Sequence, residues 1–197
     1  MAAEKKKSER KAIDKKPVKK AAANAKVVLK KTKGKDGGGE VGFVVPRGGQ
    51  VIKYFNLMPA LPTKSGPGDW IFTECGSSID IASLSVGFEL NPSALEREFE
   101  RAILVINIQQ YPAAGGTWRF ALGGVATDHG DVNPDNDIAL DIIDNGFTLL
   151  VYVHALENND ELIPFGFVAS FTESKTGKVS IYESKDPIII VDRPPKP

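Results

Sequence analysis

Positive and negative charges occupy different parts of this chain of 197 residues, and this division limits which residues can form a core. Residues 1–35 contain 14 Lys and Arg against three acidic residues, a net charge of +11. The remaining 162 residues contain 11 basic and 22 acidic residues, a net charge of −11. A segment so rich in lysine and so poor in apolar residues cannot bury enough apolar surface to fold alone. We therefore expect the folded part to begin only near residue 41.

Composition divides the chain into four segments. Residues 1–35 are expected to be a Lys-rich disordered arm, because like charges repel and Pro17 interrupts any long helix. Residues 36–40 contain three consecutive glycines and are predicted to be a flexible hinge. Residues 41–192 have the size of one domain, and residues 193–197 form a Pro-rich tail that should be extended.

Short β-type runs, separated by Gly, Pro, Asn and Asp, dominate the domain and predict an all-β fold. No regular alternation of strands with helices is present, so we expect an antiparallel β-sandwich or barrel with the disordered basic arm attached. The predicted strands are residues 41–45, 50–57, 70–74, 79–89, 102–110, 117–126, 147–156, 165–172, 178–182 and 188–191. Two helices are predicted, at residues 93–101 and 138–143.

Two apolar patterns add detail to the predicted β-fold. Between residues 79 and 88 the large apolar side chains change parity near Ala82 and Ser83, which indicates a β-bulge or a bend. Residues 102–106 and 147–153 are continuous apolar runs, as expected of strands that are covered on both faces. In a small sandwich such coverage suggests a contact between subunits.

Nothing in the sequence points to catalysis or to a membrane. Cys75 is the single cysteine, and neither His129 nor His154 lies in a recognisable catalytic motif, so we interpret all three as structural or surface residues. No apolar run approaches 18 residues, and the N-terminus lacks the apolar stretch of a secretory signal. We expect a soluble, intracellular protein that is not an enzyme.

The acidic loop at residues 128–137 is the one candidate metal site. Its carboxylates partly follow the spacing of a calcium loop, but Asn136 replaces the required glycine and Ile142 replaces the bidentate glutamate. A solvated acidic turn is the favoured interpretation, and a looser divalent cation site, such as Ca²⁺ shared between subunits, is the alternative. The candidate ligands are Asp128, Asp131, Asp135 and Asp137.

The basic arm is interpreted as a nucleic-acid-binding segment. Lysine ammonium groups neutralise phosphates without reading sequence, and residues 1–42 contain no aromatic side chain for base stacking. A nuclear-import or chromatin tail and a solubilising extension are the alternatives. The candidate binding residues are Lys5, Lys6, Lys7, Arg10, Lys11, Lys15, Lys16, Lys19, Lys20, Lys26, Lys30, Lys31, Lys33 and Lys35.

The order of a Lys-rich arm, a glycine hinge and an all-β domain resembles the coat proteins of small icosahedral RNA viruses. The likeness is to plant viruses of the bromovirus, ourmiavirus and satellite-virus type, and it concerns layout only. It rests on the lysines at 5–7, 15–20 and 26–35 and on the glycines at 37–39. Arms of that class are often arginine-rich, whereas this one contains only Arg10.

The resemblance implies that the all-β domain is an antiparallel, jelly-roll-like β-sandwich. It also implies a capsid protein that self-assembles into a large homo-oligomeric shell and packages single-stranded RNA through its arm. It also implies location in the virion, and in the host cytoplasm during assembly. Two other functions stay open: a nucleic-acid-handling β-sandwich without a shell, such as a movement protein or a histone-chaperone-like protein, and a virion decoration protein.

Overall fold

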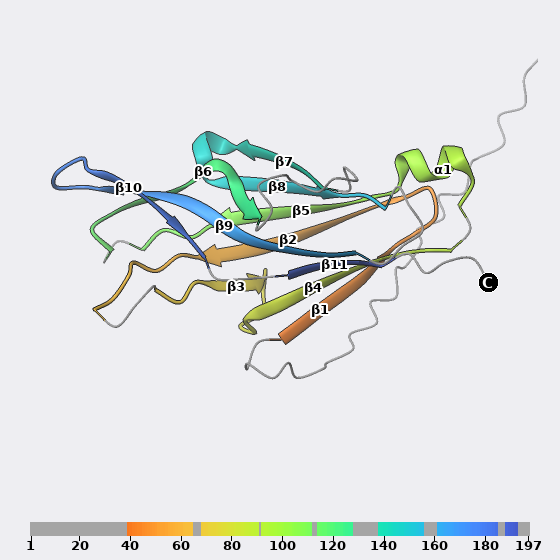
Figure 1. Ribbon diagram of the computed structural model, residues 1–197, viewed down its shortest axis with the longest axis horizontal. Coiled ribbons are helices and arrows are strands. Elements are labelled where there is room, and N and C mark those ends of the chain that lie inside the picture. Colours follow the sequence, from red (N-terminus) through yellow and green to blue (C-terminus); the bar gives the residue numbers. More distant parts are fainter. Residues whose placement is uncertain are drawn as a thin grey trace, which may run out of the picture.

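Strands make up most of the computed structural model, which describes residues 39–64, 68–90, 92–111, 114–127, 138–155, 161–184 and 188–192. In these residues the strands form two layers, and one short α-helix closes the end opposite the β9–β10 hairpin (Figure 1). The elements are β1 (Gly39–Val45), β2 (Gln50–Met58), β3 (Ile71–Glu74), β4 (Ile81–Phe88), α1 (Ala94–Phe99), β5 (Arg101–Ile108), β6 (Gly116–Thr127), β7 (Ile138–Ile143), the 3-10 turn η2 (Asp144–Gly146), β8 (Thr148–Val153), β9 (Glu161–Glu173), β10 (Val179–Glu183) and β11 (Ile188–Asp192).

The predicted all-β sandwich is confirmed. One sheet has the strand order β1-β4-β11-β9-β10, with β6 also paired to β9, and the other has the order β3-β2-β5-β8-β7. Each of the ten predicted strands overlaps an observed one. Gly39 and Glu40, predicted to belong to the hinge, are instead the first residues of β1. The predicted arm, residues 36–38 of the hinge and the tail at 193–197 lie outside the described residues.

One core joins the two sheets. Alternate side chains of β5 are buried, and they pack with the inward side chains of β4, β8 and β9 in a single apolar cluster. The ring centroids of Phe72 in β3 and Phe167 in β9 lie 5.1 Å apart, which is a direct aromatic contact between the sheets. Burial of this kind, at about 25 cal/mol per Å² of apolar surface, is the main force that holds the layers together.

Strand pairing differs from the expected antiparallel arrangement. Among the described strands, β1 pairs with β4, β11 with β4 and β2 with β5 in parallel, whereas the remaining pairs are antiparallel. The connections explain two of these pairs. Residues 46–49 carry the chain from β1 in one sheet to β2 in the other, and the segment with α1 carries it from β4 to β5. Because both connections cross at the same end, β1 lies parallel to β4 and β2 lies parallel to β5.

Side chains tie the two crossing connections to each other. The backbone N–H of Gly48 donates to Oε1 of Glu100 at 2.9 Å, and the N–H of Arg47 donates to Oε2 of Glu89 at 3.0 Å. The side chain of Glu100 has no exposed surface, although glutamate is rarely buried. Its position is explained by this link, which fixes the turn between the sheets against the end of the helix segment.

Local signals account for α1 and for the bulge. Ser93 and Glu96 form a capping box at the start of α1, so the helix predicted at 93–101 is confirmed over a shorter range. In the β1–β4 pair the register moves from Gly39 opposite Ile81 to Glu40 opposite Ser83, which leaves Ala82 without an opposing residue. The predicted irregularity near Ala82 is therefore confirmed.

The helix predicted at residues 138–143 is wrong, because this segment is strand β7. It pairs antiparallel with β8 through a turn at Asp144, Asn145 and Gly146, all of which have positive φ values. Asp-Asn-Gly between two apolar runs is a hairpin signal, and the isoleucines at both ends of the segment favour a strand.

Candidate functional surface

All of the residues predicted to bind a ligand lie outside the described part of the chain. This applies to every candidate nucleic-acid-binding residue of the arm and to Asp128, Asp131, Asp135 and Asp137. Both sites therefore stay predictions. Among the described residues, no group of three or more His, Cys, Asp and Glu side chains is placed to hold a metal ion.

Cys75 and His154 are too far apart to act together. Cys75 is exposed beyond the end of β3, and its N–H donates to the carbonyl of Tyr54 at 2.9 Å. His154 follows β8, and β2 and β5 lie between β3 and β8 in the sheet. At roughly 4.8 Å per strand this separation is about 14 Å, so the histidine cannot take a proton from the thiol. His129 lies outside the described residues.

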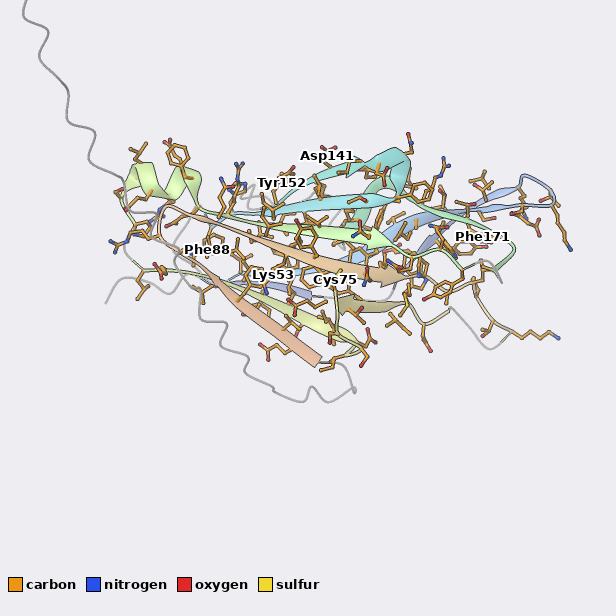
Figure 2. The ribbon with its side chains drawn as sticks, turned by 180° about the vertical axis from the view of Figure 1, so that it is seen from behind. Lys53, Cys75, Phe88, Asp141, Tyr152 and Phe171 are labelled. Atoms are coloured by element: carbon orange, nitrogen blue, oxygen red, sulfur yellow. The ribbon has the colours of Figure 1, made fainter. Side chains whose placement is uncertain are left out.

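The surface with an unusual composition is the outer side of the β3-β2-β5-β8-β7 sheet, which we call the outer face. Residues of β5 alternate between buried and partly exposed, so Ile103 and Val105 point away from the core. The same holds for Leu150 and Tyr152 in β8. Figure 2 labels Tyr152 and Asp141 along this side of the molecule.

Register brings these side chains into two adjacent rows. Ile52 of β2 lies opposite Ile103, which in turn lies opposite Tyr152. In the next row, Tyr54 lies opposite Val105, and Val105 lies opposite Leu150. Cross-strand neighbours on one face of a sheet are in contact. The resulting apolar patch consists of Ile52, Tyr54, Ile103, Val105, Leu150 and Tyr152.

The patch is open to solvent at its β2 side. Ile52 is 51% exposed and Tyr54 is 55% exposed, whereas the four members on β5 and β8 are partly buried by their neighbours in the sheet. Single exposed apolar residues are common on proteins, but a contiguous group marks an interaction surface. The outer side of the other sheet differs, since β4 presents Ser83, Ser85 and Gly87 there.

Polar residues border the patch at one end. Thr148 Oγ1 donates to Asn107 Oδ1 at 3.0 Å, and Gln109 Nε2 donates to Asn56 Oδ1 at 2.8 Å. Asn56 and Asn107 face each other in the β2–β5 register, so these bonds form a short ladder across the sheet. Because these groups satisfy one another within the chain, the ladder supplies a polar rim and does not require a ligand.

Charge is nearly absent from the outer face. Among the outward side chains of β2, β5, β7 and β8, only Arg101 and Asp141 are charged, and they have opposite signs. Nucleic-acid interfaces are strongly positive, so this face does not suit a polyanion. Depletion of charge at the centre with aromatic and aliphatic side chains is typical of protein–protein interfaces.

The sequence predicted this surface in part. The apolar runs at 102–106 and 147–153 predicted central strands that are apolar on both faces, which the structure shows. That a second subunit covers the outer side stays a prediction. The contribution of Ile52 and Tyr54 was missed, because Lys53 interrupts their run. The structure places Lys53 on the other side of β2, where it pairs with Glu74 at 2.9 Å and lies 5.6 Å from the centroid of the Phe43 ring.

Comparison with known protein families gives a match to the residues that form the sandwich. A family model described as the DP-EP family matches residues 40–193, which is well over half of the chain and runs from the second residue of β1 through β11. No curated protein matches the sequence. The matched range excludes the basic arm, residues 1–35. A membrane-spanning helix is absent from the described ranges, where the one α-helix has six residues.

Proposed function

The chain belongs to the DP-EP family through its β-sandwich, and we propose that it is a structural protein that self-associates and binds nucleic acid through residues 1–35. In its fuller form, the proposal is a capsid protein of a small icosahedral RNA virus. The sandwich then forms the shell, and the arm with its net charge of +11 offsets the charge of the packaged RNA.

The apolar patch is the observation that carries the proposal. Isolated β-sandwiches bury one side of each sheet and present polar residues on the other. Here the outer side of β5 and β8 is apolar at its centre, polar at its rim and nearly uncharged, as in surfaces that pack against protein. Since the domain carries a net charge of −11, its copies repel each other at long range, and an uncharged patch is where close contact costs least.

The charge division supports a separate role for the arm. The domain would repel nucleic acid, whereas the arm places 14 cationic side chains in 35 residues. Lysine-rich segments bind phosphates by releasing counterions, and this binding is independent of sequence. The two halves of the proposal therefore use different parts of the chain, and each can be tested separately.

Ile52→Glu is the test of the self-association half. It places a charge in the apolar patch at a site that is already 51% exposed, so the domain should stay folded. Ile181→Glu is the matched control, because Ile181 is 52% exposed on β10, away from the outer face. Analytical ultracentrifugation should show that Ile52→Glu lowers the sedimentation coefficient of the associated protein while Ile181→Glu does not. Equal sedimentation of the two variants contradicts the assignment of the patch.

Deletion of residues 1–35 is the test of the nucleic-acid half. The full chain should bind single-stranded RNA with an affinity that falls with salt, by a slope of about −0.7 in log–log form for each phosphate contacted. The deleted chain should lose this binding and keep the unfolding midpoint of the domain, which the family match covers without the arm. Salt-dependent binding that survives the deletion contradicts the role of the arm.

Particle size separates the capsid form of the proposal from its rivals. Electron microscopy of the purified full chain should show closed particles if the protein forms a shell. Small oligomers that bind RNA support a nucleic-acid-handling protein without a shell. Decoration of a pre-formed particle of opposite charge, without self-assembly, supports a virion decoration protein.

A further inference from the structure

Strand β1 leaves one edge of its sheet unpaired among the described residues. It pairs only with β4, and no other described strand pairs with its second side. Its seven residues contain a single charged side chain, Glu40, and no proline. Val44 is 51% exposed on this strand. Long edge strands without charge or proline readily pair with another chain.

The other edges are shortened, interrupted or charged. β3 has four residues and β10 has five. The register of β6 breaks between Phe120 and Val125, where Leu122, Gly123 and Gly124 all have positive φ values. β7 carries Asp141. Such features are the usual means by which edges are kept from pairing. The one charge of β1, Glu40, and its register shift lie at its first two residues, so Val41–Val45 is the longest edge segment in the described residues without a charge or a break.

Hydrogen bonds show which residues of β1 face the open side. The N–H of Gly39 donates to the carbonyl of Asp80 at 2.7 Å, and the carbonyl of Val45 accepts from Glu89 at 3.1 Å. Backbone groups of successive strand residues point to opposite sides, so the odd-numbered residues of β1 face β4. Gly42 and Val44 therefore direct their N–H and carbonyl groups away from β4.

We propose that β1 pairs antiparallel with β1 of a second copy about a two-fold axis, which extends the sheet across two subunits. A register centred on Phe43 places Gly42 opposite Val44 of the other copy, and each pair exchanges both backbone hydrogen bonds. The exposed Val44 side chain then lies beside a residue without a side chain. Glu40 of each copy lies at opposite ends of the pair, so the like charges are kept apart.

The inference rests on the proposed self-association and adds a second, different contact to it. A two-fold contact through the outer face alone stops at a dimer, because an isologous interface uses the same patch on both subunits. A second interface on another part of the subunit is required for any larger assembly. The β1 edge and the apolar patch lie on different sheets, so both contacts can form on one subunit.

Amide hydrogen exchange of the associated full chain tests this contact directly. The amides of Gly42 and Val44 should be protected in the assembly and exchange rapidly in dilute, dissociated protein. The amides of Val41 and Phe43, which face β4, should be protected in both states and serve as internal controls. Rapid exchange of Gly42 and Val44 in intact assemblies overturns the inference.

Val44→Pro is the variant that tests the same β1 contact by mutation. Proline removes an N–H that points to the open side, so no hydrogen bond to β4 is lost, whereas Val44→Ala keeps this donor. Val44→Pro should reduce the assembly to the species held by the outer face, and Val44→Ala should not. Unchanged assembly of Val44→Pro overturns the inference. If the proline variant does not fold, Val44→Lys replaces it, since a lysine on the edge opposes pairing.

Three further outcomes identify what failed. If Ile52→Glu dissociates the protein while Val44→Pro does not, the edge contact is wrong and the proposed function stands. If the wild-type chain does not associate at all, the proposed self-association is wrong. Protection of Gly42 and Val44 that is independent of protein concentration, and that deletion of residues 1–35 removes, assigns the edge to the arm of the same chain and overturns pairing between copies.

Discussion

Replacement of Glu100 by alanine tests whether this side chain stabilises the domain by joining the two connections that cross between the sheets. Oε1 of Glu100 accepts from the N–H of Gly48 at 2.9 Å, and this bond joins the β1–β2 turn to the segment between β4 and β5. The N–H of Arg101 also donates to the carbonyl of Gly49 at 3.3 Å, so the backbone link next to it stays in the variant. Glu100→Ala therefore removes one identified link and leaves its neighbour.

The expected loss of stability is about 1–2 kcal/mol. A typical hydrogen bond contributes roughly 0.5–1.5 kcal/mol net, and a buried donor left without a partner costs about 1–3 kcal/mol. Gly48 is exposed, so water can partly replace the lost acceptor and the upper figure does not apply. The fully buried stem of Glu100 adds a packing loss to the hydrogen-bond loss. For a domain of this size the melting temperature should fall by roughly 2–8 °C.

Urea unfolding followed by tryptophan fluorescence measures the effect, at one protein concentration because association stabilises the native state. Trp118 is buried and contacts the Phe171 ring at 4.9 Å, so its emission reports on the core. Glu98→Ala, at an exposed site two residues earlier, is the control and should stay within about 0.5 kcal/mol of wild type. Glu100→Gln keeps an acceptor and should lie between the two. A Glu100→Ala midpoint equal to that of Glu98→Ala refutes the proposed link.

Two further predictions concern local backbone and charge. The urea midpoint of Gly124→Ala should be lower than that of Gly177→Ala. Both glycines have positive φ, so alanine is strained at either position. A Cβ at 124 would also lie 2.7 Å from Cδ1 of Leu149, whereas a Cβ at 177 meets open space. Hydrogen bonds from the Ser93 backbone and side chain, and then the charge of Arg47, lower the pKa of Glu96 below its ordinary value of 4.5. Its stabilisation is therefore present above that value and lost as the pH falls through the lowered pKa. Acid titration of Glu96→Gln should lack this component, and an unchanged titration curve contradicts it.

Much of the strand pattern was predictable because it depends on local sequence. Alternating apolar residues bounded by Gly, Pro and Asn located ten strands, and the parity change near Ala82 located a bulge. Asn91, Pro92 and Ser93 marked the start of the helix in the sequence, and Ser93 is the N-cap of α1 in the structure. The wrong helix at residues 138–143 also has a local cause, because the Asp-Asn-Gly sequence after the segment forms a hairpin turn that pairs it with the next strand.

The apolar patch was only partly predictable. The apolar runs in β5 and β8 indicated strands covered on both faces, and both strands contribute to the patch. Ile52 and Tyr54 join them only because β2 lies parallel to β5 in one register. The sequence of β2 by itself does not determine which strand pairs with it.

The sequence by itself determined the division between a basic segment and an acidic domain, the all-β class and the positions of most strands. Charge, apolar period and turn residues are local properties, and they act over a few neighbours. Only the tertiary structure decided that residues 46–49 connect two different sheets. That choice depends on Glu89 and Glu100, which are more than 40 residues away and hold the turn in place. Parallel pairing, the apolar patch and the open edge of β1 all follow from such distant contacts, which no local pattern contains.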